Sequence, residues 1–208
     1  SLALGQDVSF IIVGAREDLL EPDINLMFFS KYDSISDRLT SLSIPVKTLM
    51  EIPGFGLDSV DRAVGFGGMD LLSLTLKKAL AMDIEKYVLF DVLNTVDALG
   101  NIYINNDSPL IIDHYQDGSP IELSAGTNEI DGATAVSFLK HYSGIREDVP
   151  ISQNIMQKQV FDAIFERIVG SGEEDLEKNL NSIISYFDTN FSMEDFTRLV
   201  STIANLED

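Results

Sequence analysis

The apolar residues of this chain fall into short runs with strand composition, and longer stretches with helical spacing lie between them. Short apolar runs bounded by turn residues are typical of strands, whereas apolar residues at roughly every third or fourth position are typical of amphipathic helices. The segments with strand composition are 8–13, 26–32, 39–46, 87–92, 101–105 and 111–115. Because strands and helices alternate, the pattern predicts an α/β layer fold and not a helical bundle or a β-sandwich.

Helical spacing predicts two amphipathic helices in the body of the chain. The first, over 69–81, is entered through Gly67 and Gly68. The second, over 151–169, has the clearest pattern, and Gly170 follows its last turn. Its apolar stripe, which we expect to pack on the sheet, comprises Ile151, Ile155, Val160, Ile164 and Ile168.

The C-terminal part predicts two further helices. The first covers 173–187, and its acidic first turn suits the positive end of a helix dipole. The last helix opens at Ser192, which forms a capping-box pattern with Asp195. In that pattern a side chain accepts a hydrogen bond from an otherwise unpaired backbone N–H.

Composition fits one compact domain over residues 1–208. Apolar residues make up 45% of the 208 positions, which supplies a full core. The formal net charge is −20, from 34 acidic and 14 basic side chains, and no cluster of Lys and Arg offsets it. A nucleic acid backbone would be repelled, so we expect no nucleic acid partner. The absence of cysteine excludes disulfides, thiol nucleophiles and cysteine-based zinc sites.

The chain contains no segment that predicts a membrane span or a signal peptide. Apolar runs such as 26–29 are far too short to cross a bilayer. Residues 1–6 lack the basic segment and apolar core of a secretory signal. Any membrane anchor is therefore expected to precede Ser1.

A spaced series of motifs runs through nearly the whole chain. In order, these are Ser43-Ile44-Pro45, AVGFGG at 63–68, YVLFDVLNTVDALG at 87–100, Ile130-Asp131-Gly132 with Ala135, and YFDTNFSMEDFTRLV at 186–200. They resemble the LytR-CpsA-Psr family, bacterial surface enzymes that transfer a glycopolymer from a polyprenyl-pyrophosphate carrier to peptidoglycan. The resemblance implies an α/β domain of three layers, in which a central mixed sheet has helices on both faces.

The same resemblance implies a location and partners. Members of the family usually carry an N-terminal membrane helix, so the chain is expected to be the extracytoplasmic domain of a membrane-anchored protein. The expected partners are a polyprenyl-phosphate lipid or an envelope glycan. Contact with the membrane is expected only through the missing N-terminal anchor.

The chemistry of the family places a divalent cation and several arginines around a pyrophosphate, because charge on the phosphate oxygens must be neutralised during transfer. Where the family has the first metal-binding aspartate, this chain has Arg16, directly after Gly14 and Ala15. The second metal-binding carboxylate is retained as Asp23. A cation cannot replace a metal ligand, so we expect no cofactor. Asp23 remains the candidate that would contact Mg²⁺ if one were bound.

The family arginines are also replaced. The Ser-Ile-Pro motif is followed here by Val46 and Lys47 instead of Arg-Asp. Two arginines of a later helix correspond to Lys140 and Tyr142, and in the Arg-x-x-Arg-Gln pattern of the long helix only Gln157 fits. Lysine offers a point charge and not a planar two-pronged donor, so even Lys140 is not a conservative replacement.

Several replacements nevertheless carry positive charge. Arg16, Lys47 and Lys140 stand at or beside positions that surround the pyrophosphate in the family. Arg62 lies on the segment that leads into the Gly-Gly turn. If these cations converge, they would bind an anion without a metal, and we treat them as candidates for an anion-binding site.

Without the resemblance, several of these residues have simpler interpretations. Asp23 follows Pro22 and is then a carboxylate of a turn or a strand edge. The segment 65–68 could cradle a phosphate on free amides, but it lacks the lysine of a P-loop and is more typical of a tight turn. His114 and His141 are too isolated for a zinc site and are interpreted as surface or half-buried residues.

Two further carboxylates, Asp91 and Asp97, fall inside apolar segments. A buried carboxylate needs hydrogen-bond donors, so we expect amide partners for both. Asp97 matches a structural aspartate of the family, for which turn capping is the expected role.

Three function classes remain open. The first is an active phosphotransferase for envelope glycopolymers, which requires at least two carboxylates near one metal, such as Glu17 or Asp18 with Asp23. The second is a catalytically degenerate domain that binds polyprenyl (pyro)phosphate or a glycopolymer in an apolar cleft. The third is a structural or interaction domain in which core side chains such as Phe28 or Phe66 fill that cleft, as could Phe161. We favour the second class.

Overall fold

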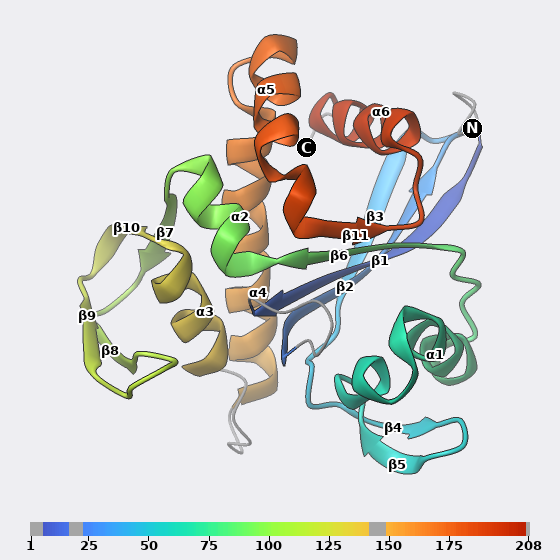
Figure 1. Ribbon diagram of the computed structural model, residues 1–208, viewed down its shortest axis with the longest axis horizontal. Coiled ribbons are helices and arrows are strands. Elements are labelled where there is room, and N and C mark those ends of the chain that lie inside the picture. Colours follow the sequence, from blue (N-terminus) through green and yellow to red (C-terminus); the bar gives the residue numbers. More distant parts are fainter. Residues whose placement is uncertain (1–5, 17–22, 142–148, 207–208) are drawn as a thin grey trace. The chain divides into compact units, whose positions relative to one another are not determined.

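The computed structural model in Figure 1 describes residues 6–16, 23–141 and 149–206. The chain divides into two compact units. The first comprises Ser1–Leu89 and Asp188–Asp208, and the second comprises Phe90–Phe187. The expectation of one domain over 1–208 stays a prediction, because compact units within a chain can belong to one domain. Among the described residues, no helix is both long and apolar enough to cross a membrane.

The first unit is built on a five-stranded sheet with the order β11-β6-β1-β2-β3. Its strands are β1 (Val8–Arg16), β2 (Asp23–Asp33), β3 (Arg38–Ser43), β6 (Lys86–Asp91) and β11 (Phe187–Thr189). β1 pairs antiparallel with β2, and β2 pairs antiparallel with β3. The arrows of β1 and β6 point the same way in Figure 1, so the sheet is mixed.

One face of this sheet packs on α1 (Arg62–Leu80). Ile11 and Val13 alternate along β1 toward this face, and both are fully buried. Leu72 and Leu76 of α1 belong to the same buried cluster and are also fully buried. Their four-residue spacing places them on one face of the helix.

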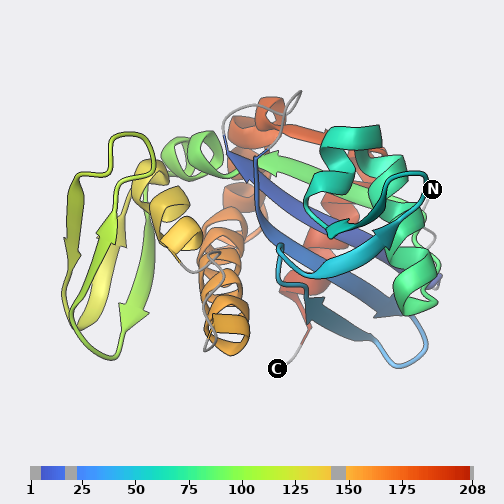
Figure 2. The ribbon, with the colours of Figure 1, turned by 90° about the horizontal axis from the view of Figure 1, so that it is seen from below.

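The other face of the sheet packs on the C-terminal segment. The ring of Phe10, on β1, lies edge-on to Phe191 at a centroid distance of 6.0 Å. Phe191 in turn contacts Phe196 of α6 (Met193–Ala204) at 6.3 Å. Figures 1 and 2 agree that α1 and α6 lie on opposite faces of the sheet. The prediction of an α/β fold with a central mixed sheet and helices on both faces is confirmed.

The start of α6 follows the predicted capping pattern. The Ser192 hydroxyl accepts a hydrogen bond from the Asp195 backbone N–H at 3.1 Å. The same hydroxyl donates to the Asp195 carboxylate at 2.7 Å. Ser192 is thus the N-cap of α6 and satisfies a backbone N–H of its first turn.

Helix α1 contains a break at Gly67 and Gly68. Gly68 adopts φ +68°, a left-handed conformation that glycine reaches without steric strain. The predicted helix over 69–81 is the segment after this break, and the sequence pattern missed the earlier part that begins at Arg62. The pattern also missed a hairpin of β4 (Leu49–Ile52) and β5 (Gly56–Ser59).

The second unit combines helices with two separate two-stranded ribbons, β10-β7 and β8-β9. Its strands are β7 (Ile102–Asn106), β8 (Leu110–Asp113), β9 (Pro120–Leu123) and β10 (Gly126–Ile130). Its helices are α2 (Val92–Leu99), α3 (Gly132–His141), α4 (Val149–Val169) and α5 (Glu173–Ile183), followed by the short 3₁₀ helix Ile184–Tyr186. α4 packs on β7, α5, α3 and α2.

The acidic helix is shorter than the prediction of 173–187. It ends at Ile183, and the chain then passes through the 3₁₀ turn into β11. The ring of Phe187 stacks on Phe90 with a centroid distance of 5.4 Å. The aromatic contact and the strand pairing therefore override the helical propensity of this segment.

The predicted apolar stripe of α4 is wrong at one position. Val160, Ile164 and Ile168 are buried, but Ile155 is 56% exposed. Ile155 and Ile164 are nine positions apart, which at roughly 100° per residue places them on opposite sides of the helix. Gln153 and Gln157 complete the buried side instead, with exposures of 3% and 1%. The side chain of Ile151 lies outside the described residues.

Two carboxylates, the buried Asp91 and the exposed Asp97, order the starts of α2 and α3. The Asp91 carboxylate accepts a hydrogen bond from the Asn94 backbone N–H at 2.9 Å and so caps α2. The Asp97 carboxylate accepts one from the Gly132 N–H at 2.8 Å, at the start of α3. The expectation of amide partners for Asp91 and Asp97 is confirmed. A Cβ at Gly132 would lie 2.2 Å from the Leu93 carbonyl oxygen, so this contact requires glycine.

Replacing Ile164 by Asp should unfold the protein or lower its melting temperature by more than about 10 °C. Burial of an isoleucine contributes about 1.5–3 kcal/mol, and a carboxylate at this site would lack a partner. Ile155→Asp on the opposite side of α4 is the matched control and should change stability by less than about 0.5 kcal/mol. Thermal denaturation followed by circular dichroism measures both. Equal losses for the two variants would show that the buried side of α4 is assigned incorrectly.

Gly132→Ala should lower the free energy of unfolding by about 1–3 kcal/mol, because the added methyl group collides with the Leu93 carbonyl. Gly65→Ala is the control, since its added Cβ meets nothing within 4 Å inside a helical segment. That variant should be neutral or stabilising by up to about 1 kcal/mol. Urea denaturation compares the two. A Gly132→Ala protein as stable as the parent would contradict the close packing of α2 on α3.

Candidate functional site

Arg16 and Asp23 face each other across the first pair of strands. The pairing of β1 with β2 places Arg16 directly opposite Asp23, after a register shift at Gly14 and Ala15. The guanidinium Nη1 lies 3.9 Å from the Asp23 carboxylate, and the side chains are 34% and 38% exposed. The carboxylate that the resemblance implies as a metal ligand is therefore next to a fixed cation.

The register shift comes from one additional residue in β2. Ala15 pairs with Ile24 whereas Gly14 pairs with Leu26, so Asn25 is the bulged residue. Asn25 is 1% exposed, and its side-chain amide donates to the Asp23 carbonyl oxygen. The bulge thus fixes the backbone of Asp23 and sets which residue lies opposite Arg16.

Lys47 forms an ion pair with Asp61. Asp61 is 9% exposed, and its backbone N–H donates to the Val46 carbonyl at 3.1 Å. Asp61 Oδ1 is buried without a hydrogen-bond partner among the described residues. The lysine therefore compensates a nearly buried carboxylate at the start of α1.

Arg62, the first residue of α1, lies four positions after Asp58 of β5 and pairs with it at 3.5 Å. Its guanidinium carbon is also 5.3 Å from the centre of the Phe66 ring, in a cation–π contact. Phe66 stacks in parallel on Phe55 at 4.5 Å. Arg62 is thus held between a carboxylate and an aromatic pair.

The predicted cations therefore divide between the two units. Arg16, Lys47 and Arg62 belong to the first unit, and each is paired with a carboxylate. Lys140 belongs to the second unit, where it is half-buried in the last turn of α3. Their convergence on one anion stays a prediction. An anion that bound to them would compete with the carboxylates.

Whether Asp23 can hold Mg²⁺ depends on the oxygen ligands beside it, and the expectation that no metal is bound stays a prediction. Mg²⁺ takes near-octahedral oxygen ligands, including one or two carboxylates in most protein sites. Residues 6–16, 23–141 and 149–206 contain no group of three or more His, Cys, Asp or Glu side chains placed to hold a metal. Glu17 and Asp18, the carboxylates expected to assist Asp23, lie outside the described residues, as does Tyr142.

The remaining candidates lie in the broken helix α1, in the β8–β9 turn and at the end of α3. Gly65 lies within the first helical part of α1, so the segment 65–68 is a helix with a break and not an open loop before a helix. His114 is 3.4 Å from Asp117 in the turn between β8 and β9, and its ring stacks on Tyr115. Hydrogen bonds from Ser119 hold the pKa of the Asp117 carboxyl below its ordinary value. His141, at the end of α3, is half-buried.

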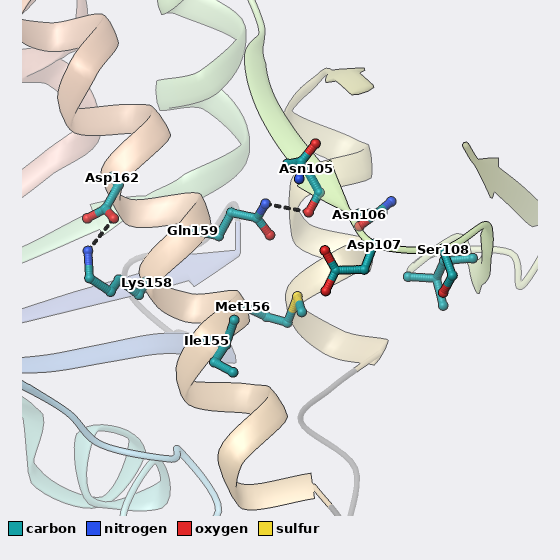
Figure 3. A pocket seen from close by; sticks show the side chains of 10 residues that line it. Asn105, Asn106, Asp107, Ser108, Ile155, Met156, Lys158, Gln159 and Asp162 are labelled. Atoms are coloured by element: carbon teal, nitrogen blue, oxygen red, sulfur yellow. Dashed lines mark hydrogen bonds and ion pairs between the residues drawn. The ribbon is translucent and has the colours of Figure 1, made fainter. Parts of the chain in front are cut away.

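A groove in the second unit has no counterpart in the sequence-based predictions. It has a volume of about 540 Å³ and lies between α4 and the turn that joins β7 to β8, as Figure 3 shows. The end of β7 contributes Asn105 and Asn106 to its lining, and the turn contributes Asp107 and Ser108. The run of polar residues directly after a strand was the available signal for this groove.

Comparison with known proteins assigns the family. The LytR_cpsA_psr family profile matches residues 23–208. The chain belongs to the LytR_cpsA_psr family. The resemblance expected from the sequence is thereby confirmed.

Relatives of this LytR_cpsA_psr chain are named for cell wall biosynthesis and teichoic acid transfer. It is 27% identical over 136 residues to the probable cell wall biosynthesis protein LcpB of Corynebacterium glutamicum, covering 64% of this chain and 31% of LcpB. It is 28% identical over 137 residues to TagU of Bacillus cereus, a polyisoprenyl-teichoic acid–peptidoglycan teichoic acid transferase, covering 64% of this chain and 42% of TagU. The chain therefore spans less than half the length of these two curated relatives.

Solved structures of similar fold include Bacillus subtilis TagV and a complex of TagT. TagV superposes with a TM-score of 0.78 at 18% identity, over 97% of this chain and 81% of TagV. TagT bound to LI-WTA superposes with a TM-score of 0.75 at 20% identity, over 100% of this chain and 78% of TagT. At these identities the similarity supports the fold.

Titration with MgCl₂ or MnCl₂ should reveal no stoichiometric site at sub-millimolar concentration, because Arg16 repels a cation beside Asp23. Asp23→Ala should give the same calorimetric trace as the parent. A stoichiometric site in the parent that disappears in Asp23→Ala would contradict this prediction and favour an active enzyme.

Proposed function

We propose that this LytR_cpsA_psr domain binds polyprenyl (pyro)phosphate or a glycopolymer at the cell envelope and has lost the transfer reaction. The observation that carries the proposal is the ion pair of Arg16 with Asp23. The guanidinium lies 3.9 Å from Asp23, at the position where the resemblance implies a second carboxylate.

The ion pair changes what the site can do electrostatically. Transfer from a pyrophosphate carrier needs concentrated positive charge that can follow the charge developing on the leaving oxygen. A divalent cation supplies two charges at one point, whereas a guanidinium supplies one charge spread over a plane. Arg16 also shares its charge with Asp23, so it stabilises a developing oxyanion less than a metal would. Binding of a phosphate in its ground state requires less concentrated positive charge than the transfer reaction does.

The lipid part of the ligand would contribute independently of these charges. Burial of a polyprenyl chain is favourable roughly in proportion to the apolar area removed from water. That contribution does not depend on the arginines that have been replaced. A domain of this composition can therefore keep affinity for the carrier after losing turnover.

An active phosphotransferase is the second candidate. TagU carries the name of a polyisoprenyl-teichoic acid–peptidoglycan teichoic acid transferase, and this chain shares 28% identity with it over 137 residues. Asp23 is retained. An interaction domain without a ligand is the third, and it is supported by the packing of Phe28, which is 4% exposed, and of Phe66 against the core. Phe161, also considered for that role, is half-buried in α4.

The proposal includes an extracytoplasmic location. The chain would be tethered by an anchor outside this sequence, and its partners would be a polyprenyl-phosphate lipid or an envelope glycan. The named functions of LcpB and TagU in cell wall biosynthesis and teichoic acid transfer support this setting.

The purified chain should transfer little or no oligosaccharide from a lipid-pyrophosphate carrier to peptidoglycan fragments, with or without Mg²⁺. Loss of one charge-stabilising donor commonly lowers the rate by about 10²- to 10³-fold, and several are replaced here. Equilibrium binding of polyprenyl phosphate in detergent micelles should remain detectable. The product is measured by mass spectrometry.

The triple variant Arg16→Asp/Val46→Arg/Lys140→Arg tests whether the lost groups act together. Groups that act on one pyrophosphate work as a unit, so the triple variant should gain activity that the single variants do not. Lys178→Arg, an exposed charge-conserving change in α5, is the matched control. Turnover by the unmodified chain comparable to that of TagU would refute the loss of catalysis, and absence of lipid binding would refute the lipid-phosphate part of the binding function.

A further inference from the structure

Strand β3 forms one edge of the five-stranded sheet in the first unit, and its outer side is open. The strand order ends with β3 beside β2. Its residues Arg38, Thr40, Ser41 and Leu42 are exposed. The opposite edge is β11, which is only three residues long. A very short edge strand discourages pairing with another chain, so the sheet is protected at one edge and not at the other.

The pairing of β3 with β2 determines which backbone groups point outward. The Ile44 N–H donates to the Met27 carbonyl at 2.9 Å, in continuation of the β2–β3 register, so these opposite residues form a hydrogen-bonded pair. In an antiparallel ladder such pairs alternate with pairs that make no hydrogen bond to each other. The even-numbered residues of β3 therefore bond to β2. Leu39 and Ser41 direct their N–H and C=O groups away from the sheet.

β3 lacks the features that usually keep an edge strand from pairing. Natural edge strands carry lysine or proline, contain a β-bulge, or are covered by a loop or helix. The sequence of β3, RLTSLS, has neither lysine nor proline, and its only charged residue is Arg38 at the start. Its register with β2 runs without a bulge to Ser43. The exposure of Thr40, Ser41 and Leu42 leaves room for another strand beside it.

A second copy of the chain matches this edge about a two-fold axis at Thr40. An antiparallel register with Thr40 opposite Thr40 places Leu39 opposite Ser41 of the second copy, and Ser41 opposite its Leu39. Each of these two pairs exchanges both of its N–H···O=C bonds, so every outward group finds a partner. Arg38 then lies opposite Leu42, where the stem of the arginine covers the apolar side chain. No like charges of the two strands face each other.

We propose that β3 pairs antiparallel with β3 of a second copy, so that the two sheets become continuous across a two-fold axis at Thr40. Closed two-fold dimers are the commonest oligomers, and they require a self-complementary surface of this kind. The pairing goes beyond the proposed function, since it uses neither the Arg16–Asp23 pair nor a lipid or glycan.

The size and the charge of the contact determine its strength. One six-residue strand is far smaller than the roughly 20–30 residues a side of a stable interface, so the Kd should be on the order of 0.1 mM. Two copies with a formal net charge of −20 each also repel each other. Salt screens this repulsion and does not weaken backbone hydrogen bonds between strands. Added NaCl should therefore strengthen the dimer.

Sedimentation velocity measures the association. The weight-average mass should rise above the 23.0 kDa of one chain as the concentration increases from about 10 µM to about 1 mM, and more so at high salt. Amide hydrogen exchange locates the contact in the same samples. Exchange at Leu39 and Ser41 should slow with concentration. Exchange at Thr40 and Leu42, whose N–H groups already bond to β2, should not change.

Engineered cysteines test the register, because the chain has no cysteine of its own. In the proposed dimer the two copies of position 40 form a non-hydrogen-bonded pair, with Cα atoms about 4.5 Å apart, which a disulfide can span. Thr40→Cys should therefore form a covalent dimer on mild oxidation. Leu42→Cys is the matched control, exposed on the same face of β3. Its two copies would lie more than about 13 Å apart, so it should remain monomeric on a denaturing gel.

Ser41→Pro tests the outward hydrogen bonds. Proline is tolerated on an edge strand where its missing N–H faces away from the sheet, so the variant should fold but associate at least tenfold more weakly. Ser41→Ala is the control, since it loses the same hydroxyl contact with Ser30 but keeps the N–H. It should dimerise like the parent. If Ser41→Pro does not fold, the cysteine variants decide.

Three results would overturn the proposal. The first is a chain that stays monomeric up to about 1 mM, which would leave the edge to a different extended segment. The second is equal cross-linking of Thr40→Cys and Leu42→Cys, which would indicate random collisions. The third is a folded Ser41→Pro protein that dimerises as the parent does.

Discussion

The antiparallel pairing of β1 with β2 is the constraint on which the first unit depends. Both strands are buried on both faces, so each face of the sheet must be covered by a separate layer. The Ile11 and Val13 side chains require α1, and the Phe10 ring requires the C-terminal segment with α6. The same pairing brings Arg16 opposite Asp23. The register of β1 with β2 therefore determines both the packing of the core and the position of Arg16 beside Asp23.

The second unit is organised by hydrogen bonds to backbone groups between elements. Asp97 links α2 to the first residue of α3, and Arg167 of α4 donates to the carbonyls of Gly100 and Asn101 at 2.7 Å. These contacts hold short helices and two-stranded ribbons that would be marginal alone. The groove beside α4 is defined by the same kind of contact, from Gln159 to Asn105. Polar contacts thus help to hold the elements of this unit together, as the continuous sheet does in the first unit.

The sequence predicted the strands that are apolar along their whole length and the helix start with a local cap. It failed for elements in which only some positions are buried. β1, β2 and β6 are apolar runs, and Ser192 is a local cap, so each could be recognised without tertiary information. The buried side of α4 could not be recognised in this way. Gln153 and Gln157 are buried and Ile155 is exposed, which is the reverse of what their polarity favours. The hairpin of β4 and β5 was missed because its strands are short and its exposed positions carry leucines.

The site was predicted residue by residue but not as an arrangement. Family motifs identified positions 16, 23, 47 and 62, yet no motif indicated that each cation would have a carboxylate partner. The partner of Arg16 depends on a bulge at Asn25, which adds one residue to β2 and has no sequence signature of its own. The groove depends on how α4 faces the β7–β8 turn, which is a tertiary property.

The bulge at Asn25 also bears on how such a chain can change over generations. Two carboxylates directly opposite on neighbouring strands repel each other, and a bound divalent cation is one way to relieve that repulsion. An arginine at position 16 meets Asp23 from within the chain, so the pairing of these two strands needs no external ion. Once folding is independent of the metal, the other groups that served the metal are released from that requirement. Under the proposed function, lysine at positions 47 and 140 is one consequence of that release, because a site that only binds its ligand places fewer demands on these positions.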